Sequence, residues 1–149
     1  MYEIDFTESE KGRLDDISLY TTRLERMIEE LEVEGDFSIT YLSDDEIRRL
    51  NAEYRDKDEA TDVLTFRLKD DDTFPDFGLS NELGDVFISL DAVARNAAEF
   101  SVPFEEELTR VMLHGLMHLM GYDHQSNDFK SEQMLIKQEE ILRKLGYAG

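Results

Sequence analysis

All three histidines of the chain lie within eleven residues, in the segment HGLMHLMGYDH at positions 114–124. His114 and His118 are four residues apart in a pattern that predicts a helix, so their imidazoles should project from one face. Gly121 follows where a glycine can end a helix in the left-handed conformation, which would turn the chain and bring His124 back toward the other two. The spacing therefore predicts a site for one metal ion.

The donor set favours zinc. The chain has no cysteine, so a transition metal must be bound through imidazole or carboxylate groups. Three imidazoles at tetrahedral corners leave a fourth corner open, which is typical of catalytic rather than structural zinc sites. The same groups can also bind iron or copper, but zinc suits three imidazoles and a redox-neutral hydrolase best. We therefore expect one Zn²⁺ ion and hydrolytic chemistry.

The same spacing occurs in the HExxHxxGxxH pattern of metzincin peptidases, in which the glutamate is the general base. Gly115 stands at that position here, so a peptidase would lack its base. Glu105, Glu106 and Glu107 lie two or more turns upstream, and we interpret them as favourable charges near a helix start.

The 149 residues, 40% of them hydrophobic, are enough for one domain over residues 1–149. Four segments have the pattern of strands: 2–6, 37–42, 63–66 and 85–89. Five segments have helical periodicity: 14–31, 47–54, 90–100, 103–119 and about 129–145. Ser43 and Glu46 predict a capping box that opens the helix through 47–54, and the segment DDDTFPDFGLSNELG at 70–84 predicts a surface loop.

Charge and hydropathy limit the partners. Thirty-six acidic against sixteen basic residues give a net charge of −20, which should repel nucleic acid and anionic membranes at long range. No apolar run approaches the roughly 18 residues of a membrane span, and the first residues do not resemble a secretory signal. We therefore expect a cytoplasmic protein that does not bind membranes.

Three blocks, taken together, carry a specific resemblance. HGLMHLMGYDH looks like the signature of the YbeY family, bacterial zinc-dependent endoribonucleases of ribosomal RNA maturation. NAEYRDKDEATDVLTF at 51–66 and LGDVFIS at 83–89 are similar to the family's other blocks, in the expected order. The resemblance covers nearly the whole chain, although Ala60 and Arg67 occupy positions where the family often has proline.

The resemblance implies a single α+β domain with a small mixed sheet of about four strands, flanked by about five helices. It implies that His114, His118 and His124 bind the zinc ion, and that Arg55 matches the arginine that the family needs in its cleft. It implies cleavage of single-stranded rRNA near the 3′ end of 16S rRNA, a role in ribosome quality control, and partners in the small ribosomal subunit, including a small-subunit ribosomal protein. DNA is not an expected substrate.

A physical argument also favours phosphate binding by Arg55, because a planar guanidinium can bind a phosphate through two parallel hydrogen bonds. We expect His114, His118 and Arg55 to act in catalysis, with water or the ribose 2′-hydroxyl as nucleophile. Thr61 and Asp62 are candidates to hold the loop's backbone or to orient a ligand, and Asp85 is a candidate acceptor for an imidazole N–H. To reconcile an acidic chain with RNA, we expect a local strip of cations beside the metal: Arg48, Arg49, Arg55, Lys57, Arg67 and Arg95.

Two alternatives stay open at this level. A metal-dependent hydrolase of peptides or amides shares the histidine spacing. A ribosome-assembly binding protein in which zinc mainly stabilises the fold would share the ligands without cleaving RNA.

Overall fold

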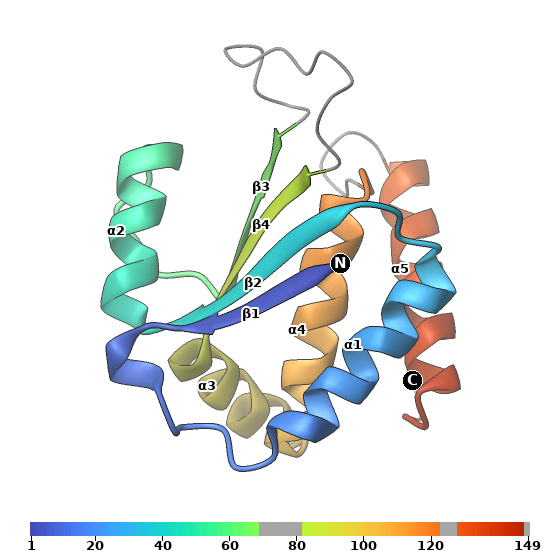
Figure 1. The fold of residues 1–149 in the computed structure, drawn as a ribbon, viewed down its shortest axis with the longest axis horizontal. Coiled ribbons are helices and arrows are strands. Elements are labelled where there is room, and N and C mark those ends of the chain that lie inside the picture. Colours follow the sequence, from blue (N-terminus) through green and yellow to red (C-terminus); the bar gives the residue numbers. More distant parts are fainter. Residues whose placement is uncertain (69–81, 123–127, 148–149) are drawn as a thin grey trace.

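The computed structural model describes residues 1–68, 82–122 and 128–147, and within them a mixed sheet (Figure 1). Its strands are β1 (Tyr2–Phe6), β2 (Asp36–Leu42), β3 (Val63–Arg67) and β4 (Glu82–Ser89). They lie in the order β1-β2-β4-β3. β2 is parallel to both of its neighbours, whereas β3 is antiparallel to β4 and forms one edge. The expected four-stranded mixed sheet is confirmed.

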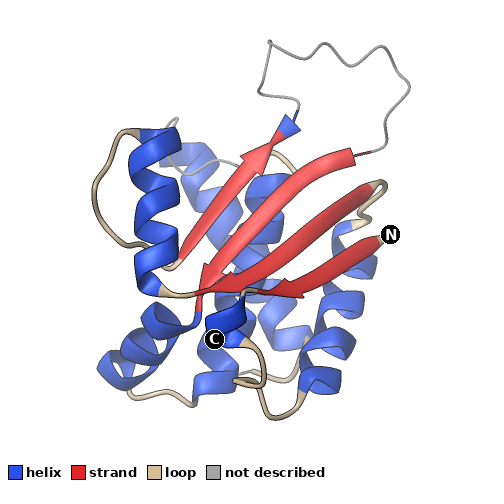
Figure 2. Cartoon of the chain, turned by 60° about the vertical axis from the view of Figure 1, so that its left-hand side comes forward, coloured by secondary structure: helices blue, strands red, loops and turns tan. Residues whose placement is uncertain are grey.

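Five α-helices are present in the described ranges, as expected for an α+β domain. They are α1 (Ile17–Leu31), α2 (Asp44–Arg55), α3 (Leu90–Phe100), α4 (Phe104–Leu119) and α5 (Asp128–Lys144), with a short 3-10 helix, η1, at Glu8–Glu10. α1, α4 and α5 lie on one face of the sheet and α2 lies on the other (Figures 1 and 2). None of the described helices is both long and apolar enough to cross a bilayer.

Strand alternation divides the apolar side chains between two cores. Phe37, Ile39 and Tyr41 of β2 point toward α4 and join the larger core. A smaller core lies under α2, where Ile47 packs with Leu64 of β3. β3 therefore has α4 on one side and α2 on the other, and its residues link the two helices.

The capping box at the start of α2 is confirmed. The Ser43 hydroxyl accepts a hydrogen bond from the Glu46 backbone N–H at 3.3 Å, and the Glu46 carboxylate accepts one from the Ser43 N–H at 3.1 Å. The helix then runs to Arg55, and Asp56 follows in the left-handed conformation. The start and the end of α2 together place Arg55 beside β3.

The starts of α1 and β4 differ most from those expected. α1 begins at Ile17 rather than near residue 14, because the Asp16 carboxylate caps it by accepting from the Leu19 N–H at 3.2 Å. β4 begins at Glu82 rather than at 85, so the end of the expected loop is wrong; residues 70–81 lie outside the described part.

Gly84 lies at an irregularity near the start of β4. The register of β4 against β2 shifts beside this residue, as it does at a bulge. Its φ is +143°, and a Cβ atom there would lie 2.0 Å from the Phe66 carbonyl oxygen. The glycine permits close approach of two strands, whereas in the sequence it looks like a loop residue.

Candidate active site

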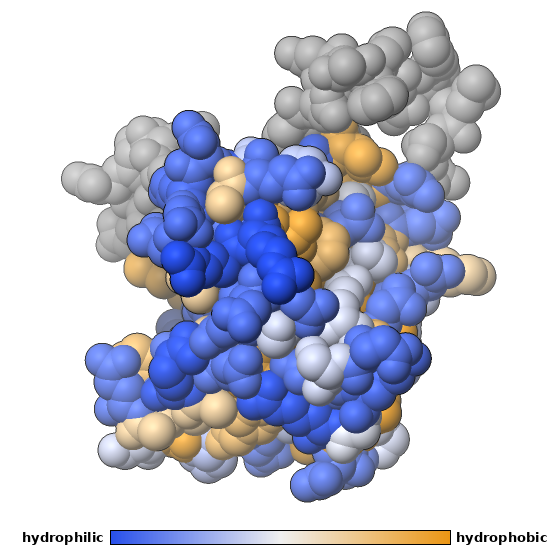
Figure 3. Space-filling view, turned by 90° about the vertical axis from the view of Figure 1, so that its left-hand side faces the viewer, coloured by the Kyte–Doolittle hydropathy of each residue, from blue (hydrophilic) through white to orange (hydrophobic). Residues whose placement is uncertain are grey.

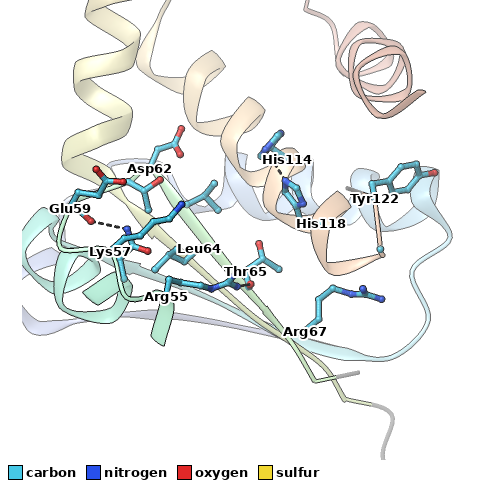
Figure 4. Close-up of a pocket in the computed structure, with 14 residues that line it drawn as sticks. Arg55, Lys57, Glu59, Asp62, Leu64, Thr65, Arg67, His114, His118 and Tyr122 are labelled. Carbon is cyan, nitrogen blue, oxygen red and sulfur yellow. Dashed lines mark hydrogen bonds between the residues drawn. The ribbon is translucent and has the colours of Figure 1, made fainter. Parts of the chain in front are cut away.

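His114 and His118 lie one turn apart near the carboxyl end of α4 and face each other (Figure 4). Their Nε2 atoms are 3.0 Å apart, and their ring planes are inclined by 76°. Two nitrogens bound at about 2.0–2.1 Å to one tetrahedral zinc ion would be about 3.3–3.4 Å apart. The pair of imidazoles therefore fits a shared metal ion with little rearrangement.

His124 and Asp123, by contrast, lie outside the described residues, so the position of the expected third ligand is not described. Within the described ranges no group of three or more histidine or carboxylate side chains is arranged to hold a metal. The two α4 imidazoles are thus the part of the predicted ligand set that the structure brings together. The carboxyl end of a helix also carries partial negative charge, which favours a bound cation.

Gly115 sets how closely α4 approaches the sheet. A Cβ atom on this residue would lie 2.7 Å from Val86 Cγ1 and 3.0 Å from Val63 Cγ2. The Thr65 hydroxyl donates to the Gly115 carbonyl oxygen at 3.2 Å, which ties β3 to the helix between the two histidines. A glutamate like that of the metzincins would not fit here, so packing accounts for the glycine.

Arg55 reaches β3 from the end of α2. Its Nη2 donates to the Thr65 carbonyl oxygen at 2.6 Å, and its guanidinium carbon lies 5.1 Å from the centre of the Phe66 ring. The Phe66 ring packs edge-on against Tyr54, whose ring centre is 5.6 Å away. The backbone carbonyl and the aromatic face hold the guanidinium in the pocket that the histidines also line. Among the described residues no carboxylate pairs with its charge.

Arg55, Thr65, His114 and His118 line one pocket of about 490 Å³ (Figure 4). Three of its lining residues are cationic, namely Arg55, Lys57 and Arg67, and two are acidic, Glu59 and Asp62. The arrangement places imidazoles and cations around a cavity that can receive an anionic group. The face that carries α2 is otherwise mostly hydrophilic, with scattered apolar patches (Figure 3).

Of the six cations expected to form a strip, only Arg55, Lys57 and Arg67 line the pocket. Arg48 Nε donates to an Asp58 carboxylate oxygen at 2.8 Å, and Arg95 pairs with Asp44. Neither arginine lines the pocket, and Arg49 does not line it either. Among the described residues, three of the six cations therefore line the pocket, whereas Arg48 and Arg95 are paired with carboxylates.

Arg67 occupies the end of the pocket where α4 ends. Its Nε donates to the Leu119 carbonyl oxygen at 3.2 Å, one of the last carbonyls of the helix. Its guanidinium also passes Gly121, where a Cβ atom would lie 3.4 Å from Nη2. The departure from proline at this position places an additional cation in the pocket.

The acceptor for an imidazole N–H is Gln138 of α5, not Asp85 as we expected. Gln138 is 5% exposed, and its Oε1 lies 3.0 Å from His114 Nδ1. Asp85 accepts instead from the Ser38 hydroxyl at 2.5 Å. Side chains alternate along a strand, and because Val86 points into the larger core, Asp85 points to the opposite face of the sheet. The alternation of polar and apolar residues in β4 already indicates that Asp85 lies on the face away from the histidines.

Glu107 is more than a favourable charge at the start of α4. It is 4% exposed, and the Asn96 amide donates both to its carboxylate, at 3.5 Å, and to that of Asp62, at 3.3 Å. Burial raises the pKa of Glu107, although nearby Arg110 opposes the shift. Asp62 thus joins the pocket to a buried polar cluster that the sequence pattern did not reveal.

Comparison with known proteins points to one family. A sequence model described as Endoribonuclease YbeY matches residues 5–146. The chain is 43% identical to Endoribonuclease YbeY of Shouchella clausii over 78% of this chain and 76% of that protein. It is 36% identical to the Staphylococcus epidermidis protein of the same name, over 98% and 97% of the two chains.

A solved structure is similar as well. The solution structure of a Thermotoga maritima protein superposes with a TM-score of 0.65 at 31% identity, covering 97% of this chain and 89% of that one.

Proposed function

Because this chain belongs to the YbeY endoribonuclease family, we propose that it is a zinc-dependent endoribonuclease that cleaves single-stranded rRNA. The proposed reaction is phosphodiester hydrolysis during maturation of the 3′ end of 16S rRNA and in ribosome quality control. Its partners would be the small ribosomal subunit and a small-subunit ribosomal protein, in the cytoplasm. The observation that carries the proposal is a single pocket lined both by the paired imidazoles and by three cations.

His114, His118 and His124 are the residues that would hold one zinc ion. The facing Nε2 atoms of the first two support this assignment, and the chain contains no thiolate that would compete. A zinc ion bound there would act as a Lewis acid on a phosphoryl oxygen. The peptide-hydrolase alternative loses support, because Gly115 has no room for a metzincin glutamate.

Arg55 would bind the scissile phosphate. Its hydrogen bond to the Thr65 carbonyl and its contact with Phe66 fix the direction of the guanidinium before substrate arrives. A group held in place in this way can stabilise negative charge that develops on phosphoryl oxygens without first reorganising. Lys57 and Arg67 would add attraction for the phosphates on either side.

The decisive experiment is cleavage of a short single-stranded RNA by the zinc-reconstituted protein. His118→Ala should abolish cleavage, and Arg55→Ala should lower its rate by about 10²–10³-fold. Arg49→Ala is the matched control, because Arg49 is exposed on the same helix outside the pocket. Equal cleavage by all four proteins would show contamination, whereas no cleavage by wild type would favour a binding protein with a structural zinc.

The product ends distinguish the two nucleophiles. A 2′,3′-cyclic phosphate would identify the neighbouring ribose 2′-hydroxyl as the attacking group. A 5′-phosphate with a 3′-hydroxyl would identify water.

A further inference from the structure

Gln138 is a polar residue on the buried side of α5. Met134, Ile141 and Leu142 of the same helix are fully buried and pack into the larger core. Gln138 lies among them at 5% exposure, where a leucine would continue the apolar stripe. A buried amide at such a place requires a partner, and His114 Nδ1 at 3.0 Å provides one.

The hydrogen bond determines which nitrogen of His114 carries the proton. An imidazole that binds a metal through Nε2 must carry its proton on Nδ1. The Gln138 Oε1 atom is an acceptor and therefore favours that tautomer. The Nε2 lone pair of His114 is then directed toward His118, across the 3.0 Å between the two Nε2 atoms.

Helix α5 is held in position for this contact by a second link to α4. Arg110 Nη1 donates to the Glu139 carboxylate at 2.7 Å, one turn before His114 and one residue after Gln138. The two contacts lie side by side along the α4–α5 interface. The Arg110–Glu139 contact therefore fixes the position of α5 along α4, and with it the position of Gln138 opposite His114.

We propose that Gln138 is the positioning residue of the metal site: it fixes the tautomer and ring orientation of His114 and thereby sets zinc affinity. This role rests on the proposed zinc function. It differs from a purely structural role, because a structural amide would affect folding without changing the protonation of one histidine nitrogen. Partners of this kind typically change metal affinity by about 10–100-fold.

The test measures zinc affinity by competition with a chelator, and the His114 tautomer by ¹⁵N chemical shifts of the metal-free protein. Gln138→Leu should weaken zinc binding by about 10–100-fold and shift His114 away from the Nδ1–H tautomer. Gln138→Glu should retain both, because a carboxylate also accepts the hydrogen bond. Gln133→Leu is the matched control, since it makes the same change at an exposed position of α5.

Unchanged zinc affinity in Gln138→Leu, or an unchanged His114 tautomer, would overturn the proposal. If Gln138→Leu does not fold, Gln138→Met provides an apolar side chain of similar length for the same two measurements. If wild type does not bind zinc, the proposed function fails, while the tautomer comparison still decides whether Gln138 controls His114.

Discussion

Gly115 of α4 lies so close to Val86 of β4 that a Cβ atom added to the glycine would be 2.7 Å from Val86 Cγ1. Real Cβ atoms essentially never approach another heavy atom so closely, so a larger residue forces the helix, the strand or the Val86 side chain to shift. Because His114 and His118 flank this contact on the same helix, movement of α4 would displace both imidazoles. The closeness of helix and sheet is thus part of the geometry of the site.

Gly115→Ala should therefore destabilise the protein, although alanine is the better helix former by about 1 kcal/mol. Overpacking of this kind costs about 1–3 kcal/mol. After the gain in helix propensity is subtracted, the free energy of unfolding should fall by up to about 2 kcal/mol. Urea denaturation gives the free energy of unfolding. Zinc affinity should fall in the same variant because the two imidazoles move.

Val86→Ala provides the control for this prediction, because it removes the atom that the new Cβ would meet. In a double-mutant cycle, Gly115→Ala should cost less in the Val86→Ala background than in wild type. Strict additivity of the two changes would contradict the steric explanation.

Glu107 predicts an unusual pH dependence. Its pKa is raised by burial, so the folded state holds the proton at pH values where the unfolded chain has lost it. The contribution of Glu107 to stability is therefore present below its ordinary pKa of 4.5 and is lost as pH rises through the raised value. Glu107→Gln should gain stability relative to wild type between pH 4 and pH 7. A constant difference across that range, measured by urea denaturation, would argue against a buried titrating carboxyl.

Glu46 predicts the opposite trend. Burial opposes ionisation of this carboxyl, but the hydrogen bonds from the Ser43 backbone, Thr7 and Ser9 outweigh it and lower the pKa. Its contribution is therefore present above the ordinary value of 4.5 and is lost as pH falls through the lowered pKa. Glu46→Gln should be less stable than wild type at pH 7, and the difference should shrink in acid. Thermal melts at a series of pH values would show whether it does.

Local patterns predicted the parts of the molecule that depend on neighbours in the sequence. The four-residue spacing of His114 and His118 determines that they share a face of α4, and the capping box determines where α2 begins. Gln138 could not be identified in this way, because its meaning depends on which helix face α5 turns toward α4. Glu107 lies in the first turn of α4 as expected, but its burial could not be predicted, because tertiary contact with Asn96 rather than sequence position decides it.

The pocket cations predict how RNA binding responds to salt. Each phosphate neutralised on a single strand contributes about 0.7 to the slope of log K against log salt concentration. Lys57→Gln and Arg67→Gln should each weaken RNA binding and reduce that slope by about this amount, because both residues line the pocket. Fluorescence anisotropy with a short single-stranded RNA in the His118→Ala background would measure affinity without cleavage. Arg48→Gln is the control, since its guanidinium is paired with Asp58 outside the pocket. If Arg48→Gln lowered the slope as much as the pocket variants, RNA would be held by the general surface, and the strongly acidic chain would need another explanation for how it binds a polyanion.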